Sequence, residues 1–154
     1  MNRIAGGWAV LAIAGAVAVG CGEDEDEGLS KPEYVRQANA ICKKFNDQVE
    51  RQAQRAFAGI QDESDLTPAK ARGFFEEALP RYDRQIADLR KLDPPEGDED
   101  KVKRVYDIGE EEGRKIRSAL GSDREVRRLV TTDSVTPRFQ KASGEYGLDT
   151  CSED

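Results

Sequence analysis

The side chains of this 154-residue chain that could do chemistry are few in kind. The sequence has no histidine, and its only methionine and only tryptophan are Met1 and Trp8. Histidine supplies most general bases and many zinc ligands, and histidine or methionine commonly ligates haem and copper. Histidine-dependent catalysis and histidine-bound metals are therefore excluded, and we expect no cofactor. Three cysteines and 31 carboxylates remain.

The carboxylates could act in pairs, as an acid and a nucleophile do in glycoside hydrolysis. With 31 carboxylates in the chain, some pair lies at a suitable distance in any fold. Nearly all of them also fall on the predicted solvated faces of helices. We therefore predict that the protein is not an enzyme, and a hydrolase that uses carboxylates alone is the third alternative for its function.

Cys21 ends an apolar N-terminal segment. Residues 4–20 carry no charge and are rich in Ala, Gly and Val, which is the layout of a secretory signal. The sequence Ala-Val-Gly-Cys at residues 18–21 resembles the signal of bacterial lipoproteins, with Ala18 where this class usually has Leu. The resemblance implies that residues 1–20 are a signal peptide and that Cys21 becomes the lipidated first residue.

Two other interpretations of residues 1–20 stay open. The apolar run is close to the roughly 18 residues that a membrane-spanning helix needs. Residues 16–18 (Ala-Val-Ala) also fit an ordinary signal cleavage site, which would leave Cys21 as an exposed thiol. Residues 21–29 follow as the lipidated cysteine and an acidic tether, which self-repulsion keeps extended. The predicted folded domain covers residues 30–154.

The charge of the chain limits its partners. It carries 31 acidic and 24 basic side chains, a net charge of −7. We expect no nucleic-acid partner, because phosphates require clustered cations. An electrostatic hold on anionic lipid is disfavoured for the same reason. The predicted attachment is therefore a covalent lipid on the extracytoplasmic face of the cell membrane.

Cys42 and Cys151 remain once Cys21 is lipidated. Two cysteines in an exported domain favour one disulfide, with unpaired thiols as the alternative. A metal site made of two cysteines without histidine is disfavoured. The predicted bridge closes a loop of roughly 110 residues, which the chain-entropy model makes worth about 4–5 kcal/mol.

Apolar residues recur at steps of three and four along the folded part, which is typical of amphipathic helices. We predict helices over residues 30–60, 67–89, 98–121, 123–130 and 136–147. Pro80 either bends the second helix or divides it into two. No stretch alternates with the period of a strand. The sequence predicts an all-α fold, an up-down bundle of about four to five helices closed by one disulfide.

Several residues carry the expected helix ends. Ser30 and Glu33 have the spacing of a capping box. Thr67 and Asp123 are the predicted N-caps of the second and fourth helices. Gly147 is expected to stop the last helix.

Two glycines and three arginines are further candidate site residues. Gly109 and Gly113 in the third helix predict either a shallow groove for a ligand or close packing against Phe74 or Phe75, which we favour. A basic cluster in the fourth helix could bind an acidic partner or an anionic wall polymer: Arg124, Arg127 and Arg128. The alternative, which we favour, is a solvated face on which they pair with Asp123 and Glu125.

The four tyrosines of the mature chain could line a pocket, but their positions on apolar stripes favour a place in the core: Tyr34, Tyr82, Tyr106 and Tyr146.

The arrangement resembles a group of small exported lipoproteins from high-GC Gram-positive bacteria. The motifs that carry it are Cys21, the acidic tether, Ala38-Asn39-Ala40-Ile41-Cys42, Pro94-Pro95 and Tyr146-Gly147-Leu148 followed by Cys151. The resemblance spans most of the mature chain and implies no activity. We expect a non-catalytic helical module that binds another component of the cell envelope, protein or polymer. The alternative is a small-ligand carrier with a pocket near Pro80, Gly109 and Gly113.

Overall fold

The regular structure of the described chain is entirely helical. The computed structural model describes residues 28–62, 65–132 and 134–153, and Cys21 lies outside them. Within these ranges there are six helices: α1 (Lys31–Ala56), α2 (Pro68–Leu89), α3 (Glu99–Ala119), α4 (Asp123–Val130), α5 (Pro137–Tyr146) and α6 (Asp149–Ser152). The sequence predicted the first five of them, and the short α6 is additional.

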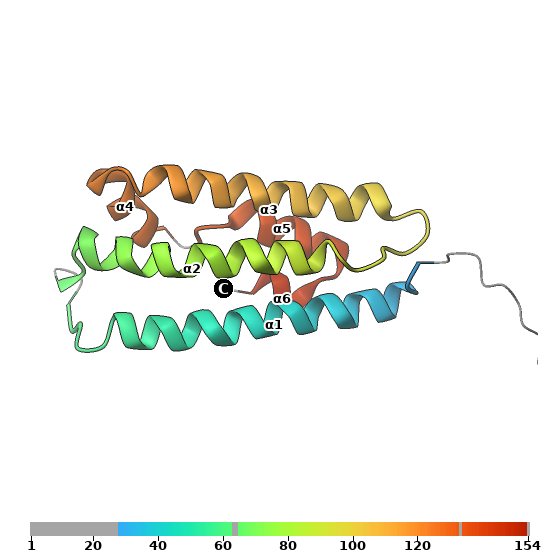
Figure 1. Ribbon diagram of the computed structural model, residues 1–154, viewed down its shortest axis with the longest axis horizontal. Helices are drawn as coiled ribbons and strands as arrows, with labels where there is room; N and C mark the ends of the chain where they lie inside the picture. Colours follow the sequence, from blue (N-terminus) through green and yellow to red (C-terminus); the bar gives the residue numbers. More distant parts are fainter. Residues whose placement is uncertain (1–27, 63–64, 133, 154) are drawn as a thin grey trace, which may run out of the picture.

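The helices form the predicted up-down bundle. They are arranged as a ring. In Figure 1, α2 runs antiparallel to both α1 and α3, and α5 returns along α3. Each helix of the ring packs against the next: α1 against α2, α2 against α3, α3 against α5, and α5 against α6. The ring closes where α6 packs against α1. The short α4 covers one end of the bundle against α2 and α3. The C-terminal segment therefore supplies the fourth side of the bundle.

Two of the predicted helix ends are confirmed. Thr67 accepts a hydrogen bond from the backbone nitrogen of Lys70 at 3.3 Å, so its hydroxyl caps α2. Gly147 has a φ of 97°, the left-handed conformation that ends α5 and that glycine adopts without strain.

Three other expectations about helix ends were wrong. Ser30 occupies the N-cap position of α1 but its side chain makes no capping hydrogen bond, so the capping box does not form. Ser122, not Asp123, is the N-cap residue of α4, because Asp123 is already helical and pairs with Arg72 at 2.5 Å. The first helix ends at Ala56, four residues before the predicted end.

Pro80 lies inside one continuous helix. α2 runs from Pro68 to Leu89 with Pro80 in its interior, on an exposed position. The alternative of two separate helices is therefore wrong.

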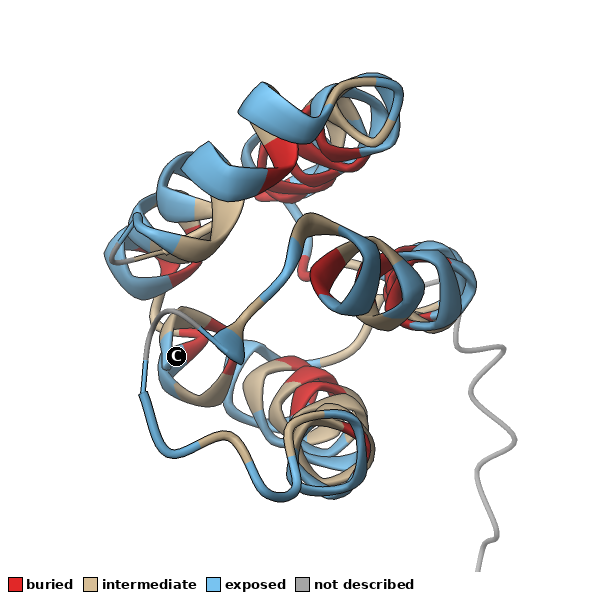
Figure 2. Ribbon diagram, turned by 90° about the vertical axis from the view of Figure 1, so that its left-hand side faces the viewer, coloured by how far each residue is buried: buried red, intermediate tan, exposed pale blue. Residues whose placement is uncertain are grey.

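The buried residues lie mainly on the sides of the helices that face one another (Figure 2). The main core contains residues of α1, α2, α3 and the C-terminal segment: Tyr34, Ala38, Cys42, Tyr82, Ile86, Leu89, Val102, Val105, Tyr106, Phe139, Tyr146, Leu148 and Cys151. A smaller cluster, formed by Phe75, Leu79 and Ile116, lies toward the end covered by α4.

The C-terminal tail is fixed to α1 by covalent and polar contacts. The sulfur atoms of Cys42 and Cys151 are 1.99 Å apart, which confirms the predicted pairing. Beside them, Asn46 donates to the carbonyl oxygen of Thr150 at 3.1 Å, and the Thr150 nitrogen donates to Asn39 at 3.3 Å. The tail and α1 are therefore held in one register.

The chain enters the bundle at the end of the predicted tether. The Leu29 nitrogen donates to the Asp93 carbonyl oxygen at 3.4 Å, and the Leu29 side chain packs against the main core. Among the described residues, none of the helices combines the length and the apolar character that crossing a membrane requires.

Candidate functional site

A pocket of about 510 Å³ opens between α1, α2 and the connection from α4 to α5. Its size lies within the ~300–1,000 Å³ range of small-molecule sites. Most of the lining is apolar or aromatic: Phe45, Val49, Phe74, Phe75, Ala78, Leu79, Tyr82, Ile116, Val135 and Phe139.

The pocket lies where the fourth side of the bundle has no helix. The last helix of the ring, α5, begins only at Pro137. Before it, Thr132, Ser134 and Thr136 of the connecting segment line the cavity in place of a helix. A connecting segment carries fewer large inward-facing side chains than a helix, so the space between α1 and α2 is not filled.

Gln85 places an unpartnered acceptor in the pocket wall. The residue is 5% exposed and lines the cavity. Among the described residues, its Oε1 atom has no hydrogen-bond partner. A buried acceptor without a partner costs about 1–3 kcal/mol. A ligand that donates a hydrogen bond to this atom would recover that cost.

The charged residues of the pocket are acidic. Glu50 and Glu153 line it, and no Lys or Arg is among the described residues of its lining. Both carboxylates belong to exposed residues, so they lie at the rim. The pocket therefore favours neutral or positively charged molecules over anions.

Glu112 positions the wall that α5 provides. Its carboxylate, on a residue only 5% exposed, accepts from the backbone nitrogens of Arg138 at 3.1 Å and Phe139 at 2.9 Å. These are orphan donors of the first turn of α5, where negative charge is also favoured by the helix dipole. Glu112 thus fixes the start of α5 and with it the ring of Phe139.

Tyr82 forms the inner wall of the pocket between two other aromatic rings. Its ring contacts Phe45 and Phe139 edge-on, with centroid distances of 5.8 and 6.1 Å. Its hydroxyl donates to the Gly109 carbonyl oxygen at 3.1 Å. Burial, with the nearby charges of Glu112 and Asp83, raises the pKa of Tyr82, so its hydroxyl remains a neutral donor.

The two glycines of α3 make room for these rings, and neither belongs to the described lining of the pocket. A Cβ atom on Gly109 would lie 2.8 Å from Ile86 Cδ1 and 2.9 Å from Phe139 Cδ2, and one on Gly113 would lie 3.2 Å from Tyr82 Cε1. The close packing favoured from sequence is therefore present. Its partners are Tyr82, Ile86 and Phe139, so the expected contact with Phe74 or Phe75 was wrong.

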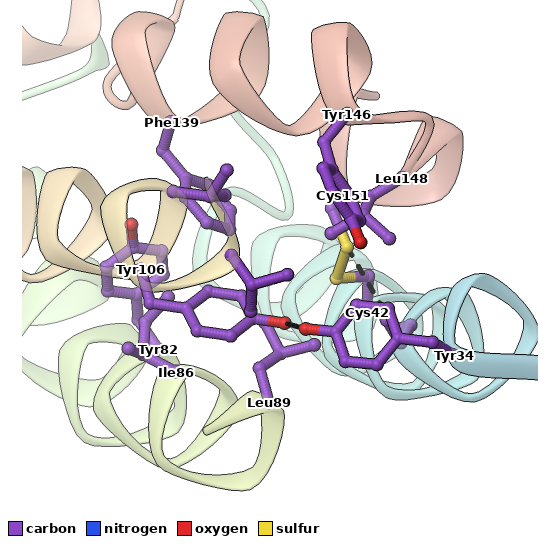
Figure 3. Close-up of a cluster of buried hydrophobic side chains, with 13 residues drawn as sticks. Tyr34, Cys42, Tyr82, Ile86, Leu89, Tyr106, Phe139, Tyr146, Leu148 and Cys151 are labelled. Carbon is purple, nitrogen blue, oxygen red and sulfur yellow. Dashed lines mark hydrogen bonds between the residues drawn. A yellow bond between two sulfur atoms is a disulfide. The ribbon is translucent and has the colours of Figure 1, made fainter. Parts of the chain in front are cut away.

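The other three tyrosines belong to the core and do not line the pocket. Figure 3 shows the hydroxyls of Tyr34 and Tyr106 meeting between α1 and α3, with Tyr146 and Leu148 beside the disulfide. The Tyr146 hydroxyl donates to Asp98 at 3.0 Å. Burial raises the pKa of Tyr106 and Tyr146, so these side chains serve as neutral hydrogen-bonding members of the core.

The arginine cluster of α4 lies on an exposed face and apart from the pocket. Arg124 and Arg128 both pair with Glu125, at 3.4 and 3.2 Å. The predicted pairing with Glu125 is therefore present, whereas Asp123 pairs with Arg72 of α2 instead. Arg124, Arg127 and Arg128 are all exposed on α4, and none of them belongs to the described lining of the pocket.

Sequence reasoning missed the pocket and its polar residue. The alternative pocket was expected near Pro80, Gly109 and Gly113; the observed pocket is lined by Ala78 and Leu79, beside Pro80, whereas the space next to both glycines is filled by side chains. Gln85 lies between Tyr82 and Ile86 on the apolar stripe of α2, and that position was the available signal. In the described part of the chain, no group of three or more His, Cys, Asp or Glu residues could hold a metal ion.

Fold and pocket together define a disulfide-closed, all-α bundle with an apolar cavity on its α1–α2 side. Comparison of the chain with protein families, curated proteins and solved structures finds no match.

Proposed function

We propose that the protein is a lipid-anchored, non-catalytic binding protein on the extracytoplasmic face of the cell membrane. It holds a small, mainly apolar molecule in the pocket between α1, α2 and residues 132–140. The observation that carries this proposal is the combination of a pocket of about 510 Å³, an apolar lining and the unpartnered Gln85 Oε1. Buried acceptors are normally satisfied, and ligand sites place a few polar groups in apolar walls.

The chemistry of the pocket describes the ligand. Aromatic and aliphatic side chains take up its apolar body, and a hydroxyl or N–H group of the ligand donates to Gln85. The rim carboxylates of Glu50 and Glu153 favour a neutral or cationic molecule. A protein of this kind stores, presents or senses its ligand. The proposal assigns no nucleophile and no general base that would convert the ligand.

The anchor is supported by the sequence around Cys21, which resembles a lipoprotein signal. Acyl chains contribute about 0.8 kcal/mol per buried CH₂ group, so two or three chains hold a small domain firmly. The tether leads to the start of α1 at Lys31, whereas the pocket is lined from Phe45 onward. The proposed binding site is therefore separated from the attachment point along α1.

The pocket is tested with N-phenyl-1-naphthylamine, a neutral apolar fluorophore that carries one N–H donor. We expect saturable binding to the full-length protein in detergent, with enhanced fluorescence. Val49→Trp places a large ring in the cavity and should abolish this binding, whereas Val49→Ala, the matched control, should retain it. Equal binding by all three proteins would contradict the proposed site.

The anchor is tested separately by the intact mass of protein isolated from membranes. We expect a chain that starts at Cys21, carries the mass of acyl chains and gains two protons on reduction. An uncleaved chain without lipid would contradict the anchor and leave the result on the pocket unaffected.

A further inference from the structure

A second concave surface lies on the outer side of the seam between α1 and α2. It is a groove of about 420 Å³, and of its ten described lining residues five are cations and one is an acid. The lining consists of Ile41, Lys44, Phe45, Gln48, Arg51, Arg55, Arg81, Arg84, Gln85 and Asp88. The groove is therefore positively charged, although the chain as a whole has a net charge of −7.

The cations stand in two rows along the groove. On α1 the polar residues follow steps of four and three, which keep them on one helix face: Lys44, Gln48, Arg51 and Arg55. On α2, Arg81 and Arg84 lie one turn apart. Because α1 and α2 run antiparallel and pack together (Figure 1), the two rows line opposite sides of one channel.

Most of these cations form no ion pair with a carboxylate among the described residues. Among the described residues, no carboxylate forms an ion pair with Lys44, Arg51, Arg55 or Arg84, whereas most other cations of the bundle are paired. The groove's one acid, Asp88, is bound by Lys91 at 2.7 Å, which with Lys44 and Arg84 lowers its pKa. Four cationic heads are thus available to an external anion.

Arg81 has a different role at the edge of the groove. Its guanidinium is held by Gln52 Oε1 at 2.8 Å and by Glu77 at 2.9 Å. Gln52 in turn donates to the Phe74 carbonyl oxygen at 2.8 Å and is 1% exposed. This chain of hydrogen bonds ties α1 to α2, so the spacing between the two rows is fixed before any anion arrives.

We propose that this groove binds a linear, phosphate-bearing polymer. Lys44 and Arg55 are 11 positions apart, or about 16 Å at the helical rise of roughly 1.5 Å per residue, which suits successive phosphates of one chain. The oxygens of a tetrahedral phosphate diverge, so arginines on both sides can bind it together. A planar carboxylate is satisfied by one bidentate arginine. The surface is distinct from the apolar pocket, although Phe45 and Gln85 contribute to both.

The shape of the groove disfavours two other polyanionic partners. A lipid surface is flat and meets protruding cations, whereas these cations line a recess between two helices. Sites for single-stranded nucleic acid combine cations with several aromatic rings that stack on bases. Phe45 is the one aromatic residue among the described residues of the lining.

The test is a titration of the full-length protein in detergent with inorganic polyphosphate of defined length, at several salt concentrations. We expect saturable binding that weakens steeply with salt. Arg51→Glu/Arg84→Glu should lower the affinity at least tenfold and reduce the salt slope by roughly 0.7 for each phosphate that the variant no longer binds. Arg124→Glu/Arg127→Glu changes the net charge equally on α4 and should leave the affinity within about twofold.

The results that would overturn the proposal are equally specific. Equal losses of affinity in the two double variants would mean general attraction without a site. Tighter binding to phosphatidylglycerol vesicles or to a single-stranded oligonucleotide than to polyphosphate would assign the groove to those partners. Arg51→Gln/Arg84→Gln, checked for unchanged melting, must also weaken binding, because both side chains are exposed and pair with no carboxylate of the described chain. None of these results depends on the lipid anchor or on the pocket.

Discussion

In the half of the bundle that contains the disulfide, the rings of Tyr34, Tyr106 and Tyr146 and the side chains of α5 and α6 fill the space between α1 and α3. In the half near α4, the cavity is lined by Thr132, Ser134, Val135 and Thr136 where the fourth side has no helix. The first half is closed by buried side chains and a covalent link. The second half exposes its apolar surface to a pocket, where burial contributes less to stability.

This difference leads us to propose that the closed half contributes most of the stability and that the half near α4 binds the ligand. The disulfide and the main core hold the ring together, so the pocket half can keep a cavity and an unsatisfied Gln85 without unfolding. Substitutions in the two halves should therefore affect stability and ligand binding to different degrees.

The largest expected effect comes from removing the covalent link. Cys42→Ser should lower the free energy of unfolding by about 2–5 kcal/mol, because the bridge restricts a loop between residues 109 positions apart. Urea denaturation of the variant and the wild type measures the difference. Unchanged unfolding after reduction of the wild-type protein would show that the closed half does not depend on the bridge.

The next effect compares a closely packed glycine with an exposed one. Gly109→Ala should destabilise by about 1–3 kcal/mol, because its Cβ would lie within 3 Å of Ile86 and Phe139. Gly73→Ala, an exposed position of α2 with no atom within 4 Å, should stabilise by about 0.5–1 kcal/mol through helix propensity. Thermal melting of both variants measures the two effects, and equal shifts would contradict the close packing at Gly109.

A smaller effect of opposite sign is expected in the pocket wall. Gln85→Leu should leave stability unchanged or raise it by up to about 1 kcal/mol, because it removes a buried acceptor without a partner. The same change should weaken N-phenyl-1-naphthylamine binding, since the ligand loses its hydrogen-bond acceptor. Melting and fluorescence titration of one preparation give both results. A large loss of stability would place Gln85 among the residues that hold the fold.

The smallest effect concerns pH. Hydrogen bonds from Lys101, Tyr146 and Lys31 lower the pKa of Asp98 from 3.8 to about 2. The folded state thus favours the ionised carboxylate, so this contribution is complete above pH 4 and is lost as the pH falls toward 2. Asp98→Asn should flatten the acid side of the stability profile, measured by denaturation between pH 2 and 6. Solvent screens the exposed lysines, so the change is modest. An unaltered profile would contradict the assignment.

The helices and the disulfide were predictable because both follow from local or compositional signals. Steps of three and four between apolar residues predicted α1, α2 and α3. The two cysteines that remain when Cys21 is assigned to the predicted lipid anchor predicted one bridge. The continuity of α2 through Pro80 was not predictable, because neighbouring helices decide whether a kinked helix remains whole.

The pocket and the groove depend on how distant segments meet. Gln85 and Glu112 are polar residues on buried faces. No local sequence pattern distinguishes a buried, hydrogen-bonded carboxylate such as Glu112 from a solvated one. The row from Lys44 to Arg55 is visible in the sequence of α1. Its pairing with Arg81 and Arg84 depends on the register between α1 and α2, which the local sequence does not specify. The arginine cluster of α4 was a candidate site in the sequence because its members lie close together in the chain.

The most direct measurement follows the backbone amide NMR signals of the full-length protein in detergent during titration with N-phenyl-1-naphthylamine. Our account predicts the largest changes in the pocket half, at residues 45–50, 74–85 and 132–140. Residues 98–106 of α3, in the closed half, should stay unchanged. Changes that centre on the closed half, or an absence of saturable changes, would contradict the assignment of binding to the pocket.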